Sequence, residues 1–481
     1  MCGIAGAIAL KSAAGKLPEP LERTVERMAQ RLTHRGPDGS GLWKSPTERI
    51  ALAHRRLAII DLTDTGRQPM EYAGRLWVTF NGEIYNFREL RPQLQGLGHT
   101  FRGESDTEVL LAAIAQWGID AALNRCFGMF ALAVWDARDR VLHLARDRMG
   151  EKPLYLSEVS GHLFFGSELR AFRAIPGLDA RISGKAANAY LRDGCVPGAL
   201  SIYEGIYKRP PGQVLTVHAG RDQRLPAGWL LPQGASLMGK MARLGSQVGS
   251  ADARRKLARI LTSRTFSETY LRLTSWWVEP SVLDGEFAPP PREWPAQFTD
   301  DLPSMLLADQ INYLPDDNLA KVDRASMATS LETRLPLLDH RLVEFSWRLP
   351  SDMKLHGRTT KWLLRAILDR YVPRSLIERP KMGFTVPIDN WLRGPLRAWA
   401  GEMLDASAFH HMFPVQPAAI RRLWDQYLGG QGPSANEIWA LVMLSAWAGS
   451  VESDVSRTDH AEPSDASQGN CRSFHAADQP T

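Results

Sequence analysis

The sequence contains few cysteines, and those that it has are far apart. The four cysteines in the 481 residues are Cys2, Cys126, Cys195 and Cys471. This spacing provides neither a pair of metal ligands nor a disulfide framework, so we expect no metal site. Free thiols are typical of a reducing compartment, which favours a cytoplasmic location.

Long apolar runs and clusters of basic residues are also missing. No apolar stretch approaches the ~20 residues that span a bilayer. The short apolar stretch at the N-terminus ends at Lys11 and lacks the basic flank of a signal peptide. The net charge is only +5 and spread along the chain, so neither a membrane nor nucleic acid is an expected partner. With 44% hydrophobic and 23% charged residues, the composition is that of a globular protein.

Among the residues that are present, Cys2 is the first candidate for chemistry. Removal of Met1 leaves a terminal cysteine whose thiol lies beside its own α-amine. A thiol is only slightly ionised at neutral pH. An α-amine titrates near ~7.7–8.0 and can therefore take the thiol proton. The alternative is a small apolar cysteine at the start of a buried strand.

Polar segments, two of them with glycine, follow Cys2 at four places. They are His34-Arg35-Gly36-Pro37-Asp38-Gly39, His54-Arg55-Arg56, Asn81-Gly82-Glu83-Ile84-Tyr85-Asn86 and Ser105-Asp106-Thr107-Glu108. In this order, and together with Cys2, they resemble the glutaminase domain of asparagine synthetases, which are class II glutamine amidotransferases. The resemblance covers roughly the first 215 residues.

The resemblance implies a nucleophile and an oxyanion hole. Cys2 would attack the side-chain amide of glutamine, with its α-amine as the general base. The side chain of Asn81 and the backbone N–H of Gly82 would bind the developing oxyanion. Donors of this kind typically change the rate by ~10²–10³.

The resemblance also implies residues that hold the rest of glutamine. The planar fork of Arg56 would bind the α-carboxylate, and Glu83 and Asp106 would receive the α-ammonium. A lid loop would close over the substrate and keep water out. Its residues are Arg35, Gly36, Pro37 and Asp38. For each charged residue the alternative is a solvated surface group.

Hydrophobic patterning predicts an α+β fold class for the first half. Strand pairs alternate with helical stretches, which predicts packed antiparallel sheets covered by helices. The resemblance implies the same arrangement, the αββα sandwich of N-terminal nucleophile hydrolases. We interpret the charged segment 145–153 as structural, with its arginines pairing nearby carboxylates. The expected strands are 3–10, 128–135, 141–145, 153–156 and 162–165, and the expected helices are 17–32 and 107–117.

The second half lacks a motif that the resemblance leads one to expect. A complete asparagine synthetase continues with a doubly wound α/β domain that activates aspartate with Mg-ATP. Its pyrophosphate loop (PP-loop) reads Ser-Gly-Gly-x-Asp-Ser, whose glycines let backbone N–H groups approach phosphates. Residues 200–450 contain one Gly-Gly pair, Gly429-Gly430, and Leu428 precedes it where serine is expected.

These observations predict four regions. Residues 2–215 form the glutaminase domain, and 216–250 form a shortened junction without the PP-loop. The similarity resumes at 251–450 with the late helices of the synthetase, a mainly helical remnant of that α/β domain. Residues 451–481 lack periodic apolar residues and are expected to be disordered.

Three residues of the helical part are candidates for a residual synthetase site. In intact relatives the residue that matches Lys361 faces the ATP site. Glu332 and Arg334 are expected to order helices and loops near the domain interface. The alternative for all three is a surface or capping charge.

The predicted activity is hydrolysis of glutamine to glutamate and ammonia through a Cys2 thioester, which needs no cofactor. The family reaction converts aspartate to asparagine with Mg-ATP, and its site is incomplete in this sequence. Two alternatives stay open. In the first, a partner chain, a second copy or an intact homologue, supplies the ATP site. In the second, the chain is a non-catalytic regulatory or assembly subunit. Because helices made to cover a sheet would lack it, we also expect the second half to be less stable or to self-associate.

Overall fold

The computed structural model describes residues 2–10, 17–219, 263–277, 282–283, 287, 292, 294–295, 298, 300–378 and 386–459, without the side chains of 453–459. The chain forms two compact units, Met1–Val386 and Pro387–Thr481. This division falls later than the predicted junction at 216–250, most of which lies outside the described residues.

A six-stranded sheet carries the start of the chain. Its order is β10-β8-β9-β1-β3-β2, and every neighbouring pair is antiparallel. Gly3 of β1 lies opposite Arg55 of β3. Because the pairing is antiparallel, Cys2 lies beside the residues that follow Arg55. The strands are β1 (Gly3–Ala9), β2 (Gly39–Lys44), β3 (Ile50–Arg56), β8 (Tyr155–Val159), β9 (His162–Gly166) and β10 (Ile206–Lys208).

A five-stranded sheet carries the second polar segment of the site. Its order is β11-β7-β6-β5-β4, again antiparallel throughout. Asn81 and Gly82 lie on β5, opposite Ala131 and Phe130 of the central strand β6. The strands are β4 (Met70–Tyr72), β5 (Leu76–Ile84), β6 (Gly128–Asp136), β7 (Val141–Arg146) and β11 (Val214–His218).

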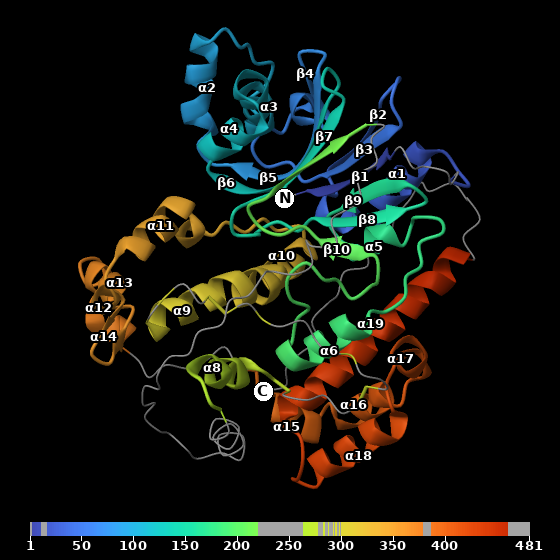
Figure 1. The fold of residues 1–481 in the computed structure, drawn as a ribbon, viewed down its shortest axis with the longest axis vertical. Helices are drawn as coiled ribbons and strands as arrows, with labels where there is room; N and C mark the ends of the chain where they lie inside the picture. Colours follow the sequence, from blue (N-terminus) through green and yellow to red (C-terminus); the bar gives the residue numbers. More distant parts are fainter. Residues whose placement is uncertain are drawn as a thin grey trace, which may run out of the picture. The chain divides into compact units, whose positions relative to one another are not determined.

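The two sheets pack face to face, and helices cover their outer faces (Figure 1). Apolar side chains of both sheets, such as Ile4, Trp135 and Phe165, fill the space between them. A second core lies between the five-stranded sheet and its helices. The result is an αββα sandwich, which confirms the predicted fold class. On the first sheet lie α1 (Leu21–Gln30) and α5 (Leu169–Phe172), and on the second α2 (Phe87–Gly96), α3 (Asp106–Trp117) and α4 (Ile119–Arg125).

The remaining described part of the first unit is mainly helical, as predicted. No pair of strands in the described residues is parallel. Met327, at the end of α10, packs on Met129 of β6, so this helix contacts the sandwich. The elements are α6 (Gly184–Asp193), α8 (Phe266–Thr274), α9 (Asp301–Ala308), η4 (Asp309–Asn318), α10 (Leu319–Met327), η5 (Pro336–Leu338), α11 (His340–Arg348), α12 (Ser351–Lys354), β12 (Leu355–His356), β13 (Thr359–Thr360), α13 (Trp362–Leu368) and α14 (Arg374–Ile377).

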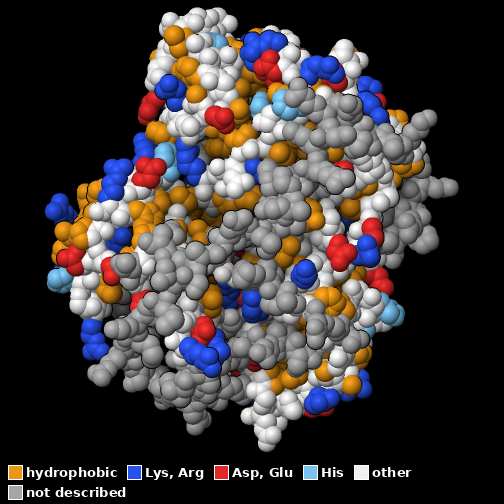
Figure 2. Space-filling model, in the orientation of Figure 1, with side chains coloured by type: hydrophobic (Ala, Val, Ile, Leu, Met, Phe, Trp, Pro, Cys, Tyr) orange, Lys and Arg blue, Asp and Glu red, His pale blue; other side chains and the backbone are white. Residues whose placement is uncertain are grey.

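Residues 328–378 contain no buried side chain. Large apolar residues of this stretch face solvent, among them Leu337, Phe345 and Tyr371. In Figure 2, hydrophobic side chains gather on the side where Figure 1 places α9 and α11 to α14. These helices therefore expose apolar side chains.

The second unit packs four short helices around one long one, with Leu404, Phe409 and Leu441 in its interior. The long helix continues past residue 451, so the prediction of disorder from that residue on is wrong for residues 451–459. An existing helix extends at low cost through residues that are compatible with helical backbone geometry. Residues 460–481 lie outside the described part. No helix in the described residues is long and apolar enough to cross a membrane. The helices are α15 (Ile388–Arg393), α16 (Arg397–Leu404), α17 (Ser407–Met412), α18 (Pro417–Leu428) and α19 (Ala435–Asp459).

Candidate active site

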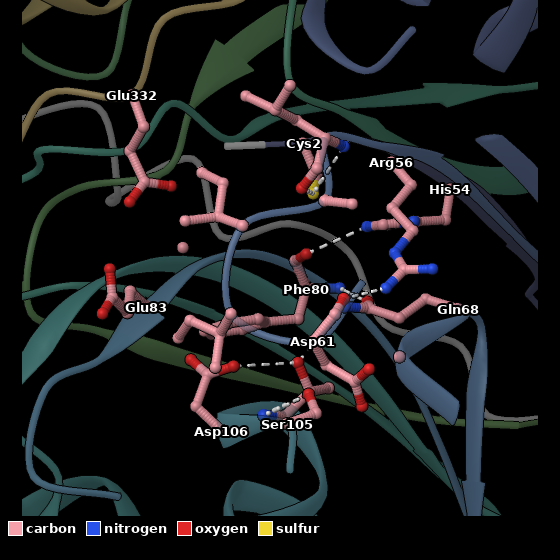
Figure 3. A pocket seen from close by; sticks show the side chains of 17 residues that line it. Cys2, His54, Arg56, Asp61, Gln68, Phe80, Glu83, Ser105, Asp106 and Glu332 are labelled. Atoms are coloured by element: carbon pink, nitrogen blue, oxygen red, sulfur yellow. Dashed lines mark hydrogen bonds between the residues drawn. The ribbon is translucent and has the colours of Figure 1, made fainter. Parts of the chain in front are cut away.

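A pocket lies between the ends of the two sheets, and Cys2 forms part of its wall (Figure 3). The sandwich contributes residues from the end of β3, from the middle of β5 and from the N-terminus of α3. Its polar and charged lining residues are Cys2, His54, Arg56, Asp61, Gln68, Glu83, Ser105, Asp106, Thr107 and Glu332.

Cys2 is buried beside the start of the loop after β3. Its Sγ lies 3.5 Å from the backbone nitrogen of Leu57. Burial raises the pKa of the Cys2 thiol, and the positive charge of the amino terminus opposes this only in part. A thiol in this setting stays protonated at neutral pH, so it needs a base before it can act as a nucleophile.

Asn81 is oriented by the backbone of Cys2. Its side-chain Oδ1 accepts a hydrogen bond of 2.9 Å from the Cys2 nitrogen. The Nδ2 donor of the same amide is buried and finds no hydrogen-bond partner among the described residues. A buried amide donor without a partner is costly, so such a group indicates a role in binding. Gly82 follows, and a Cβ there would lie 2.1 Å from the Met129 carbonyl oxygen, so only glycine fits.

Arg56 is held by backbone carbonyls at the rim of the pocket. Its Nη1 donates to Thr63 O at 2.9 Å, and its Nη2 donates to Asp61 O. The Asp61 carboxylate in turn accepts from the Thr63 and Thr65 hydroxyls at 2.6 and 2.7 Å. The guanidinium is therefore fixed in place by a loop that is itself hydrogen-bonded.

Two buried carboxylates face the opposite part of the pocket (Figure 3). Asp106, at the first turn of α3, accepts from the Ile84 nitrogen at 2.8 Å. Burial raises its pKa to about 6. Burial, together with the neighbouring Glu332 carboxylate, raises the pKa of Glu83 to about 7. Carboxylates in this state are stabilised by a positively charged ligand.

The structure places Arg35 away from the pocket lining, which differs from the lid prediction. Its guanidinium is fully buried and binds both oxygens of Asp323, at 2.7 and 2.9 Å. It also donates to Glu168 at 2.7 Å and to the Cys2 carbonyl at 3.1 Å. A guanidinium with these bonds is a structural group and not part of a moving cover. Closure by Gly36, Pro37 and Asp38 stays a prediction, and in the structure Asp38 accepts from the Ala58 nitrogen.

Two of the three residual synthetase candidates lie at this pocket instead. Glu332 is a lining residue, and Arg334 contacts both Glu332 and Glu83. The segment after α10 is bonded to the sandwich, so these two residues lie where the two halves of the sequence meet and not beside Lys361. Lys361 lies elsewhere, exposed at the N-cap of α13.

Sequence reasoning missed His54 and misjudged the partners of Arg146. His54 is buried in the pocket wall, and burial lowers its pKa to about 3, so the imidazole is neutral. Arg146 was expected to pair with carboxylates, but it donates to the carbonyls of Gly150, Lys152 and Arg209. The charged segment is nonetheless structural, since Asp147 accepts from four backbone nitrogens nearby.

Both halves of the sequence match known families. Residues 1–226 match the glutamine amidotransferase domain family, and residues 211–449 match the asparagine synthase family. The chain belongs to the glutamine-hydrolysing asparagine synthetase family. Within this family, it is an enzyme with a glutamine amidotransferase domain.

Named proteins resemble this chain over different shares of its length. Asparagine synthetase [glutamine-hydrolyzing] 1 of Bacillus subtilis is 22% identical, over 93% of this chain and 96% of its own. Asparagine synthetase 3 of the same species is 38% identical over 45% of this chain and 34% of its own. A solved glutamine phosphoribosylpyrophosphate amidotransferase from B. subtilis covers 36% of this chain and 43% of its own, at 22% identity and a TM-score of 0.30.

The alignment with the first relative extends over 617 positions, more than the 481 residues of this chain. Gaps must therefore be placed in this chain to align it. The described residues also contain no group of three or more His, Cys, Asp or Glu side chains arranged to hold a metal ion.

Proposed function

We propose that the sandwich, residues 2–215, hydrolyses L-glutamine to glutamate and ammonia through a thioester on Cys2. The observation that carries the proposal is the Asn81 amide. Its oxygen holds the nitrogen of Cys2, while its buried Nδ2 has no partner in the described residues. An orphan donor beside a nucleophile suits an oxyanion, with the Gly82 N–H as second donor.

The proposed reaction runs in two steps. After removal of Met1, the α-amine of Cys2 takes the thiol proton, and Sγ forms a bond to the side-chain amide carbon of glutamine. The carbon–nitrogen bond then breaks, and the nitrogen receives the proton from the α-ammonium and leaves as ammonia. Water attacks the thioester, gives its proton through the amine to the leaving sulfur, and releases glutamate. The raised pKa of the thiol supports the need for this base.

The charges of the pocket support an amino acid as the substrate. Arg56 lies at one end, where it would bind an α-carboxylate. Glu83 and Asp106 lie at the other, where they would bind an α-ammonium. A neutral side-chain amide between these ends can then reach the sulfur of Cys2.

The experiment is to incubate the full chain with a diazoketone analogue of glutamine and to map the modified residue by mass spectrometry. We expect a single adduct on Cys2 and the loss of glutamate release from glutamine. Cys2→Ala is the control, and it should lower glutamate release by about 10⁴-fold or more. An adduct elsewhere, or full activity of Cys2→Ala, would refute the mechanism.

We further propose that this chain by itself does not complete the ATP-dependent half of the family reaction. The sequence lacks the PP-loop, and alignment with a relative needs gaps in this chain. Lys361 is exposed, while the other two candidate residues, Glu332 and Arg334, lie at the pocket of Cys2. The residues that the structure describes therefore do not fit Mg-ATP. Pyrophosphate release that depends on aspartate and Mg-ATP would contradict this proposal.

A second candidate function is that of one half of a two-chain enzyme, a homodimer or a pair with an intact homologue that supplies the ATP site. The exposed apolar helices α11 to α14 favour it, since an apolar face of this kind is a docking surface in many proteins. Co-purification with an intact homologue, and ATP-dependent asparagine formation only in the mixture, would support this function. A non-catalytic subunit would bind the homologue without any label on Cys2.

A further inference from the structure

Glu332 belongs to the second half of the sequence, yet its carboxylate faces the pocket of the first half. In Figure 3 it lies on the same side of the pocket as Glu83, the side away from Arg56. The side chain is only 9% exposed. Burial by itself raises the pKa of Glu332, but the charge of the amino terminus and hydrogen bonds, among them the one from Arg334, outweigh it and lower the pKa. The group is therefore an ionised carboxylate inside the site.

One guanidinium holds this carboxylate together with Glu83. Arg334 Nε donates to Glu332 Oε1 at 3.0 Å. Its Nη2 lies 2.5 Å from Glu83 Oε2. One side chain therefore contacts both carboxylates, Glu332 through a hydrogen bond and Glu83 through an ion pair.

The segment that carries Glu332 is anchored to the sandwich just before it. Ser330 donates through Oγ to the backbone carbonyl of His34 at 2.8 Å, and it adopts a positive φ of 53°. Further back, Asp323 binds the buried Arg35. These two anchors explain how a residue so distant in sequence reaches the pocket.

We propose that Glu332 is a specificity-determining residue for glutamine, a third carboxylate that recognises the α-ammonium beside Glu83 and Asp106, with Arg334 as its positioning residue. The inference rests on the proposed glutaminase function. Glu332 is then a third carboxylate beside Glu83 and Asp106 in the lining of the pocket, and a cationic group stabilises carboxylates held close together. It follows that the second half completes the pocket of the first.

The test compares two substrates. Glutaramate has the side-chain amide and the carboxylate of glutamine but no α-amino group. Glu332→Gln keeps the shape of the side chain and removes its charge. We expect its KM for glutamine to rise about tenfold, the loss typical of one charged hydrogen bond, with kcat nearly unchanged. The KM for glutaramate should stay the same or fall. Arg334→Gln should change both values in the same directions but by less.

Glu344→Gln is the matched control, because Glu344 is an exposed glutamate on α11 in the same half. It should leave both KM values unchanged. Equal KM values for Glu332→Gln and the unmodified chain would overturn the inference. So would an equal rise for both substrates, because a merely structural change does not distinguish an α-amino group.

A binding measurement separates this inference from the proposed function. In the full chain carrying Cys2→Ala, calorimetry with L-glutamine measures affinity without turnover. If the unmodified chain releases no glutamate, the glutaminase function fails, but an affinity about tenfold weaker in Cys2→Ala/Glu332→Gln still supports the inference. Equal affinity of the two variants, or no binding by either, overturns it.

Discussion

The sandwich and residues 328–378 lie in one compact unit, yet they cover their apolar side chains very differently. In the sandwich, Phe164 and Trp135 are inaccessible to solvent or nearly so. In the second region Phe345 is 54% exposed, and no residue is buried at all. Both regions nevertheless have regular secondary structure.

The comparison shows that an apolar stripe is enough to define a helix but not to bury it. A helix forms from local hydrogen bonds, whereas the stability of its packed face depends on a second layer. In the sandwich the second layer is a sheet of the same chain. For α11 to α14 we propose that the layer is missing with the PP-loop segment, or is supplied by a partner.

The largest expected difference is in local stability. Backbone amides of β5 and β6 are hydrogen-bonded within a sheet that is covered on both faces. The helices α11 and α13 can unfold locally without exposing buried apolar side chains. We expect hydrogen exchange at least about 10³-fold faster in α11 and α13. Exchange measured by mass spectrometry on the full chain checks this. Similar protection in the two regions would mean that α11 and α13 are covered in solution, as by self-association.

The next largest difference is expected for matched Phe→Ala substitutions in the two regions. Phe164→Ala removes a fully buried ring and should lower the free energy of unfolding by about 3–5 kcal/mol. Phe345→Ala removes an exposed ring and should change it by less than about 0.5 kcal/mol. Denaturant unfolding followed by tryptophan fluorescence measures both. A large loss for Phe345→Ala would show that a partner layer covers α11.

The Arg35–Asp323 pair joins the sandwich to the helical part. Its removal should therefore lower the free energy of unfolding almost as much as Phe164→Ala. Asp323→Ala leaves a buried guanidinium with one carboxylate partner fewer, and we expect a loss of about 3 kcal/mol. Burial alone raises the pKa of Asp323, but the charge of Arg35 outweighs it and lowers the pKa. A lowered pKa stabilises the fold above the ordinary range of aspartate, so the contribution disappears as the pH falls below about 4. Asp405→Ala, at an exposed pair with Arg421, is the control.

The smallest expected effect is a pH dependence set by Glu83. Asp106, Glu332, Arg334 and Tyr85 face this carboxyl, and burial raises its pKa to about 7. Since the folded pKa lies above the ordinary value, the fold binds the proton more tightly, and stability falls as the pH rises from 4.5 to about 7. Glu83→Gln should therefore gain stability over the unmodified chain at pH 8 but not at pH 4, by on the order of 1 kcal/mol. Thermal unfolding at both pH values measures this, and an equal difference at both would contradict it.

Local patterns predicted most of the sandwich. The hairpin of β6 and β7 and the helix α3 follow from alternating and helical spacing of apolar residues, and the structure has them where expected. Cys2, Arg56, Glu83 and Asp106 came from short motifs, and the fold brings all four to one pocket. Their roles in catalysis remain predictions.

Long-range contacts could not be predicted in the same way. Arg35 and Asp323 are 288 positions apart, and neither stands in a pattern that points to the other. The same holds for Glu332 and Glu83. Arg146 binds carbonyl oxygens and not carboxylates because of the conformation of its loop. Residue types alone do not determine that conformation. The end of α19 was missed because helix propagation continues beyond the last apolar face.

The bond between Arg35 and Asp323 also affects how the gene can be divided. The glutamine amidotransferase match ends at residue 226, and a fragment that stops there keeps Arg35 but loses Asp323 and Met327. Such a fragment contains a complete set of sandwich strands and still leaves a buried positive charge without its aspartate. The boundary of the inherited module and the boundary of the folding unit are therefore different, and exchange of modules between relatives has to include α10.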